Sequence, residues 1–199
     1  MDFGPDTLRE QLRLLDEVGI ITVGAGENIE AAFTPNYKAV NGITLGFIAL
    51  NEIETFFQNA GIISPGSAFF DATRIEKAIK TAKANSDFVI ILPHWGNEHS
   101  KTSNISQRKW AKNFIDWGAD FVVGAHPHVT QETEYYNNCF IHYSLGNFIF
   151  SSIGWNPEAV KGAVLEIVFS EKQIKSIKTL PIEINYHGFP SFVSDGQTI

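Results

Sequence analysis

Between residues 88 and 123 the chain alternates apolar strand-like runs with a helical segment, and this alternation restricts the fold more than any other feature. Phe88–Leu92 is a short continuous apolar run, residues 106–117 carry apolar side chains at helical spacing before Gly118, and Phe121–Val123 is a second apolar run. Strands that alternate with helices are typical of a parallel sheet with helices packed on its faces. The pattern therefore predicts an α/β layered domain.

The flanking segments add further elements of both kinds. Leucines at helical spacing after Pro5 predict a helix that Gly19 ends, and Asp71 is placed to cap a second helix that runs to about Asn85. The Asn41-Gly42 pair between two apolar runs is a strong hairpin signal. Further strands are expected at residues 20–23, 37–40, 43–50, 129–136, 140–144, 148–151, 163–169 and 174–184.

Composition narrows the possible partners. The 199 residues suffice for one domain with a real core, and 15 Lys+Arg against 22 Asp+Glu give a net charge of −7 with no basic run. Nucleic acid is thus a disfavoured partner, because phosphate binding needs clustered cations. The apolar runs are strand-sized, so no membrane span is expected, and the single cysteine, Cys139, excludes an intrachain disulfide.

Three histidines, His94, His126 and His128, follow directly after predicted strands. Ligands of α/β sheets bind at the carboxyl ends of strands. Pro127 favours an extended backbone at His126, which would project the His126 and His128 rings to the same side. Imidazole suits zinc, iron or manganese, so the pattern favours a divalent metal site. Any one of these histidines taken singly is more often packed or hydrogen-bonded in the core.

Three segments carry a family resemblance: Pro-His-Trp-Gly-Asn-Glu at 93–98, Gly-Ala-His-Pro-His-Val at 124–129, and Tyr-Ser-Leu-Gly-Asn-Phe at 143–148. Together they resemble the CapA-type proteins of poly-γ-glutamate capsule synthesis, within the calcineurin-like metallophosphoesterase superfamily. The resemblance implies a layered αββα sandwich, of which residues 1–199 would form the C-terminal part. It also implies that His94 and His126 serve one metal of a binuclear centre and that His128 serves the other.

The chain departs from this family pattern in one respect. The Gly-Asp and Asn-Asn-His segments, which by the resemblance supply the remaining ligands and a bridging carboxylate, are not found in the sequence. Neutral imidazoles alone do not offset the repulsion of two nearby cations. We therefore expect a partial domain that holds metal weakly and has little or no hydrolytic activity. Its open sheet edge is expected to pair in a homodimer through Ile20–Val23 or Phe88–Leu92.

Further candidates surround the histidines. Glu98 could add a carboxylate, although a solvated loop position is about as common for glutamate. His94, Glu98 and His126 are the candidate catalytic residues, and Trp95 and Asn147 are the candidates for substrate contact. Trp95 would wall a substrate cleft beside His94, and by the resemblance Ser144 or Asn147 would lie near the site wall. The alternatives are simple packing for Trp95 and a tight turn for Asn147. His99 and His142 carry weaker signals, and His142 is expected to be a packed strand residue.

The resemblance implies a metal-dependent hydrolase that acts on an anionic polymer or a phosphoester during capsule synthesis. Two alternatives stay open, a catalytically inactive module that binds a polymer or partner and a mononuclear hydrolase that uses His94, His126 and His128 alone. Members of this family are commonly membrane-anchored and act outside the cytoplasm, but the sequence itself does not identify a compartment.

Overall fold

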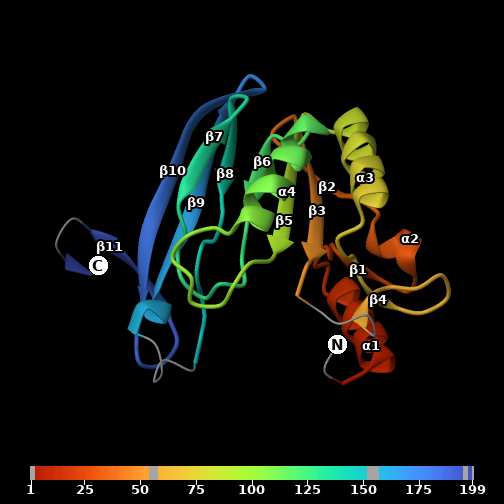
Figure 1. Ribbon diagram of the computed structural model, residues 1–199, viewed down its shortest axis with the longest axis horizontal. Helices are drawn as coiled ribbons and strands as arrows, with labels where there is room; N and C mark the ends of the chain where they lie inside the picture. Colours follow the sequence, from red (N-terminus) through yellow and green to blue (C-terminus); the bar gives the residue numbers. More distant parts are fainter. Residues whose placement is uncertain (1–2, 54–57, 152–156, 195–196, 199) are drawn as a thin grey trace.

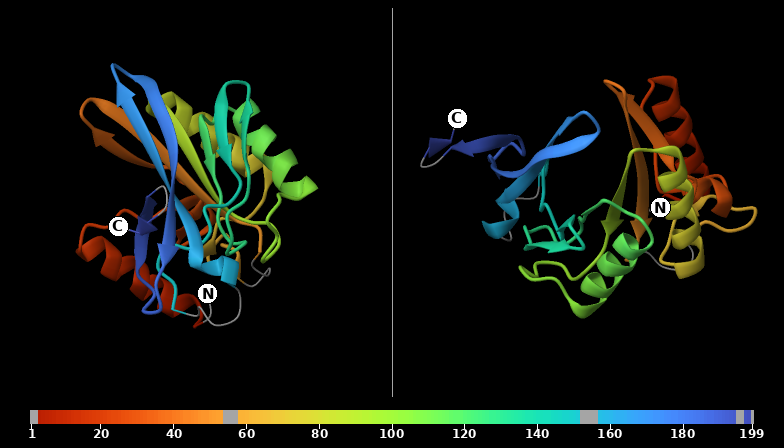
Figure 2. Two further views of the ribbon diagram at one scale, coloured as in Figure 1. Left: turned by 90° about the vertical axis from the view of Figure 1, so that its left-hand side faces the viewer. Right: turned by 90° about the horizontal axis from the view of Figure 1, so that it is seen from above.

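The computed structural model describes residues 3–53, 58–151, 157–194 and 197–198. In this part of the chain the elements form three layers, namely helices, a six-stranded sheet and a four-stranded sheet (Figures 1 and 2). These are three of the four layers of the predicted αββα sandwich. The α/β class expected from the alternating pattern is confirmed.

The six-stranded sheet contains the alternating region at its centre. Its strand order is β2-β3-β5-β6-β8-β7, in which β3, β5, β6 and β8 run parallel while β2 and β7 pair antiparallel at the two edges. The bounds are Asn36–Val40 for β2, Ile43–Asn51 for β3, Phe88–His94 for β5, Phe121–Val123 for β6, Thr133–Tyr136 for β7 and Cys139–His142 for β8. The hairpin predicted at Asn41-Gly42 joins β2 to β3, with φ values of 50° and 79°.

Helices α3 (Ala72–Asn85) and α4 (Ile105–Asp116) cover one face of this sheet (Figure 1). The Asp71 side chain accepts a hydrogen bond from Arg74 N and so caps α3 as predicted, while Asn104 and Gln107 form a reciprocal capping box on α4. Alternation along β5 divides the core. Val89 and Ile91 belong to the cluster that includes the helices, whereas Phe88 and Ile90 pack on the opposite side.

The four-stranded sheet lies against that opposite side. It comprises β9 (Lys161–Ser170), β10 (Gln173–Ile184), β11 (Pro190–Ser194) and β12 (Gln197–Thr198), preceded by a short 3₁₀ helix, η2 (Pro157–Val160). Phe169 of β9 packs on Phe88 with ring centroids 4.8 Å apart. The β9–β10 hairpin therefore covers the face that the helices leave open.

The N-terminal region consists of α1 (Pro5–Glu17), α2 (Ile29–Ala32) and two short paired strands, β1 (Ala25–Gly26) and β4 (Gly66–Ser67). The buried strand predicted at Ile20–Val23 is wrong, because these residues join no sheet and the Ile20 and Ile21 residues are 54% and 53% exposed. An apolar run forms a strand only where a neighbouring strand pairs with it, and none does here among the residues placed in the structure.

Two further strand predictions need correction. Residues 148–151 form bends instead of a strand, with Phe148 and Ile149 exposed, and the strand expected from Val129 begins only at Thr133. Strand β5 pairs with β3 on one side and β6 on the other, so Phe88–Leu92 is not the open edge that was expected to form a homodimer. Across the described ranges no helix combines the length and the apolar character that a membrane crossing requires.

Candidate functional site

The topology of the parallel strands brings the predicted histidines to one edge of the sheet. His94 is the last residue of β5, and His126 and His128 lie in the loop after the adjacent strand β6. A bridge between His94 and Ala125 extends the pairing of the two strands into this loop. The carboxyl ends of two neighbouring parallel strands thus place residues 32 positions apart side by side.

The three imidazole rings form one group. Nε2 of His94 lies 3.0 Å from Nδ1 of His126, and the two ring centroids are 4.7 Å apart. The ring of His128 follows at 6.1 Å from that of His126. The structure therefore brings His94, His126 and His128 together as expected, while their roles as ligands or catalysts stay predictions.

The backbone of this group differs from the expectation. His126 has φ 101° and His128 has φ 60°, so the Pro127 segment is not the extended chain that was predicted. The nearby His99 also has a positive φ of 60°. Non-glycine residues in such conformations cost about 1–3 kcal/mol each, persist only where the surroundings enforce them, and cluster at functional sites. We infer that the fold holds these histidines against local backbone preference.

Burial and nearby acidic side chains act on the pKa of His126 in opposite directions. Burial lowers the pKa of the His126 imidazole, while the negative charge of Glu98 opposes that shift. The Glu98 side chain is 56% exposed, and its Oε2 lies 3.9 Å from Nε2 of His99. Glu98 is therefore near the histidine group but solvated, and its catalytic role stays a prediction.

Trp95, a predicted substrate-contacting residue, lies in the core of the domain, and its contact with substrate stays a prediction. Its side chain is fully buried, stacks with Phe114 and Tyr143, and donates from Nε1 to the Tyr143 carbonyl oxygen at 2.9 Å. Gly124 admits this arrangement, because a Cβ there would meet Tyr143 O at 2.0 Å and Trp95 Nε1 at 2.4 Å. Trp95 is thus a core residue, which was the alternative explanation.

Asn147 contacts the histidine group, while its predicted contact with substrate stays a prediction. It is 9% exposed, and its amide group is directed at His128 and at backbone carbonyls. Both polar atoms of its side-chain amide are therefore engaged within the chain. His142 is buried in β8, as expected for a packed histidine.

Two residues with weak sequence signals, His99 and Glu52, also lie close to the histidine group. The ring of His99 stacks on that of His128 with centroids 6.2 Å apart, and His99 N donates to Pro127 O at 2.8 Å. Glu52, which directly follows β3, accepts from Gly96 N and from the Ser106 hydroxyl. The sequence did contain a signal for Glu52, because it follows a parallel strand just as His126 follows β6.

The donor side chains near the histidines meet the needs of a metal ion only in part. Within the ranges that the structure describes, no three His, Cys, Asp or Glu side chains are arranged to hold one metal ion. The His94–His126 pair offers two imidazole nitrogens at close range, a donor type that suits zinc, iron and manganese. The residues therefore fit part of a metal centre and lack the anionic ligands of a complete binuclear one.

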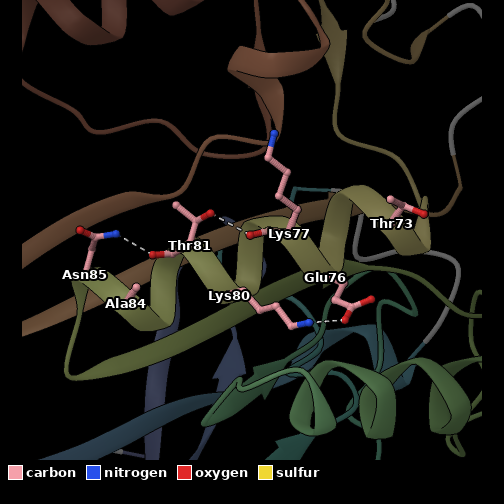
Figure 3. A pocket seen from close by; sticks show the side chains of 7 residues that line it. All are labelled: Thr73, Glu76, Lys77, Lys80, Thr81, Ala84 and Asn85. Carbon is pink, nitrogen blue, oxygen red and sulfur yellow. Dashed lines mark hydrogen bonds and ion pairs between the residues drawn. The ribbon is translucent and has the colours of Figure 1, made fainter.

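One of two surface hollows lies beside the histidine group. A cleft of about 630 Å³ opens between the two sheets beside His94 and Asn147, with apolar walls that include Leu92, Leu145 and Leu165. A second hollow runs along the outer side of α3, where Lys80 bonds Glu76 and the Thr81 hydroxyl donates to Lys77 O (Figure 3). This second hollow includes no histidine among its lining residues, so the inter-sheet cleft is the one associated with the site.

Sequence comparison gives similarities that cover most of the chain. Residues 1–152 match the family model described as bacterial capsule synthesis protein PGA_cap. The chain is 31% identical over 186 residues to the PGA biosynthesis protein CapA of Bacillus subtilis (strain 168), covering 93% of this chain and 48% of that protein. It is 34% identical over 158 residues to the capsule biosynthesis protein CapA of Bacillus anthracis, covering 77% of this chain and 38% of that protein. The chain thus spans half or less of these relatives.

Solved structures show the same fold at low sequence identity. The sulfate thiohydrolase SoxB of Thermus thermophilus superposes with a TM-score of 0.58 at 13% identity, over 88% of this chain and 30% of that one. A putative 5'-nucleotidase from Staphylococcus aureus superposes with a TM-score of 0.56 at 15% identity, over 90% and 35% respectively. At such identities the likeness concerns the fold alone.

Proposed function

Because the chain belongs to the bacterial capsule synthesis protein family PGA_cap, we propose that it acts in making or processing an anionic capsule polymer such as poly-γ-glutamate. Its fold is that of the metallophosphoesterase-like proteins. The proposed reaction is hydrolysis of a phosphoester or γ-glutamyl bond at the edge of the sheet where β5 and β6 end. The observation that carries the proposal is the convergence of His94, His126 and His128 at that edge.

The proposed cofactor is a divalent cation, manganese, zinc or iron. In this proposal His94 and His126 share one cation, and His128 supplies a nitrogen to the same centre. A bound cation of this kind polarises a phosphoryl or acyl oxygen and activates water. Because no three of the described donor side chains are arranged to hold one ion, we expect the chain by itself to hold the cation weakly.

The remaining residues have supporting roles in the proposal. Glu98, solvated and close to His99, is the candidate proton acceptor, and the cleft beside His94 is the candidate entrance for substrate. Glu52 fixes the start of the loop by accepting from Gly96 N. A cation held by neutral imidazoles would give the centre a net positive charge. Such a centre accords with an anionic capsule polymer as the substrate.

The test is cation binding followed by hydrolysis. Isothermal titration calorimetry with Mn²⁺ and Zn²⁺ should detect a site that the double variant His94→Ala/His126→Ala loses. The matched control is His187→Ala, which removes an exposed histidine of the C-terminal loop. Binding that is the same in the double variant and in the parent chain would contradict the proposed centre.

Activity is measured on a model phosphodiester and on a γ-linked glutamyl peptide, each with and without Mn²⁺. Cation-dependent hydrolysis that His94→Ala abolishes would support the proposal. Cation binding without hydrolysis of either compound, also in a chain of the full length of the relatives, would contradict the proposed reaction.

The proposed partners include a second copy of the chain. The edge strands of the six-stranded sheet are β2 and β7, and the Tyr135 residue of β7 is 64% exposed. In this proposal the homodimer forms through an edge strand, β2 or β7, and not through Phe88–Leu92, which is paired on both sides. Light scattering over a range of protein concentrations tests it, and a monomer at every concentration would contradict it.

A further inference from the structure

We propose that Asn147 is a positioning residue that sets the tautomer of His128, so that the Nε2 lone pair of His128 is presented to the site. The role of that lone pair as a metal ligand rests on the function proposed above, whereas the tautomer assignment rests on hydrogen-bond geometry alone. Asn147 lies 19 positions from His128, in the segment after β8.

The first step is the orientation of the Asn147 amide. Its Nδ2 lies 3.0 Å from the carbonyl oxygen of Ala159 and 3.4 Å from that of His128. Both partners are carbonyl oxygens, which only accept hydrogen bonds, so the group facing them must be the NH₂. The opposite atom of the amide, which faces the His128 ring, is therefore the oxygen.

The second step concerns the His128 ring. Its Nδ1 lies 2.8 Å from Asn147 Oδ1. An amide oxygen has no proton to give, so Nδ1 of His128 must be the donor in this bond. A neutral imidazole carries one N–H and one lone pair, and the lone pair is consequently on Nε2. Asn147 thereby selects which nitrogen of His128 can bind an electrophile.

Neighbouring residues restrict both the His128 ring and the Asn147 backbone. The His128 ring packs near the His99 ring, with centroids 6.2 Å apart, and near the Phe150 ring, with centroids 5.2 Å apart. The backbone of Asn147 is fixed by Gly162, where a Cβ would meet Asn147 O at 1.9 Å. Ala159 is in η2, directly before β9, so the amide connects the histidine loop to the start of the second sheet.

The orientation has a chemical consequence for ligand binding. A histidine ligand that donates its second ring nitrogen to an oxygen acceptor has a fixed tautomer and ring plane, and the loss of such an acceptor typically lowers metal affinity about 10–100-fold. Asn147 occupies that acceptor position for His128. It therefore acts through His128 and has no direct contact with the reacting atoms.

The experiment reads the tautomer directly. Long-range ¹H–¹⁵N correlation spectra of the ¹⁵N-labelled, metal-free chain at alkaline pH distinguish a histidine protonated on Nδ1 from one protonated on Nε2. The spectrum of the parent chain should show His128 protonated on Nδ1. The His128→Gln variant identifies the signal by its disappearance. A His128 signal of the Nε2-protonated form in the parent chain would overturn the proposal without any further variant.

Two substitutions at position 147 complete the test. Asn147→Ala removes the acceptor, and we expect the Nε2-protonated form of His128 to predominate together with a 10–100-fold loss of Mn²⁺ affinity. Asn147→Asp keeps an acceptor oxygen, so the Nδ1-protonated form should persist. An Asn147→Ala chain that remains folded with an unchanged His128 tautomer would overturn the proposal. If the tautomer changes as expected and Mn²⁺ binds to neither chain, the proposed function fails while the positioning role stands.

Discussion

Nε2 of His94 and Nδ1 of His126 lie 3.0 Å apart across the ends of two neighbouring parallel strands. A hydrogen bond has one donor, so in the metal-free chain only one of these two nitrogens is protonated toward the other. For both nitrogens to face one cation, the shared proton must leave this position. The pair is thus poised between a hydrogen-bonded form and a cation-bound form.

The positive φ of 101° at His126 predicts an opposition between stability and function. Glycine adopts such a conformation without steric cost, so His126→Gly should raise the free energy of unfolding by about 1 kcal/mol while it weakens Mn²⁺ binding. Urea denaturation and calorimetry measure the two effects. The control His187→Gly, at a position without a positive φ, should give no gain, and an equal change in both variants would contradict the strain at His126.

Burial of His142 predicts a stability that falls in acid. Burial lowers the pKa of His142, so the unfolded chain binds protons more readily than the native chain as the pH falls through the ordinary value of 6.5. The free energy of unfolding should therefore decrease from pH 8 to pH 5. The variant His142→Gln lacks this titrating group, so its free energy of unfolding should decrease less between pH 8 and pH 5. The decrease that remains would come in part from His126, whose pKa burial also lowers. Equal pH dependence in both chains would show that His142 does not contribute.

The close approach at Gly124 predicts a severe effect of one methyl group. Gly124→Ala places a Cβ 2.0 Å from the Tyr143 carbonyl oxygen, a backbone atom just beyond the paired ends of β6 and β8 that cannot easily move. We expect a loss on the order of 3 kcal/mol in the free energy of unfolding. The comparison variant is Gly42→Ala, where φ is 79° and no atom lies within 4 Å, and where about 1 kcal/mol is expected. A loss no larger than that of the comparison variant would refute the crowding.

Reassignment of Trp95 to the core predicts a loss of stability without a loss of cation affinity. Trp95→Phe leaves the buried Tyr143 carbonyl without the indole donor, which should cost about 1–3 kcal/mol. Mn²⁺ affinity should stay within about twofold of the parent chain. Trp117→Phe, at a half-buried position on the same core, provides the matched change and should cost less. A selective loss of cation affinity in Trp95→Phe would return Trp95 to the site.

The sequence predicted the elements whose signals are local. The Asp71 cap, the Asn41-Gly42 hairpin and the βαβ alternation through Phe88–Leu92 all depend on nearby residues, and all are confirmed. Ile20–Val23 was wrong because whether an apolar run becomes a strand depends on a distant partner. Strand β11 was not predicted, because Pro190 and the short run after it resemble a loop.

The candidate site shows the same division. The position of His94, His126 and His128 at one sheet edge followed from strand topology. Their backbone conformations did not, because Pro127 disfavours what the surrounding contacts enforce at His126. The partner of His128 could not be predicted either, since Asn147 is brought to it by long-range pairing, of Thr130 with Leu145 and of Gly146 with Gly162.

The link from Asn147 to Ala159 has a consequence for the order in which the protein folds. Strands β5 and β6 with helix α4 are contiguous in sequence, so their contacts close short loops and we expect them to form early. The hydrogen bond from Asn147 Nδ2 to the Ala159 carbonyl oxygen requires in addition that the start of β9 has packed against the first sheet. A folding intermediate that lacks the β9–β10 hairpin would thus contain the His94–His126 pair, while the Asn147 amide would lack its bond to Ala159. Completion of the histidine group would then coincide with the last packing step, and hydrogen exchange at β9 would report it.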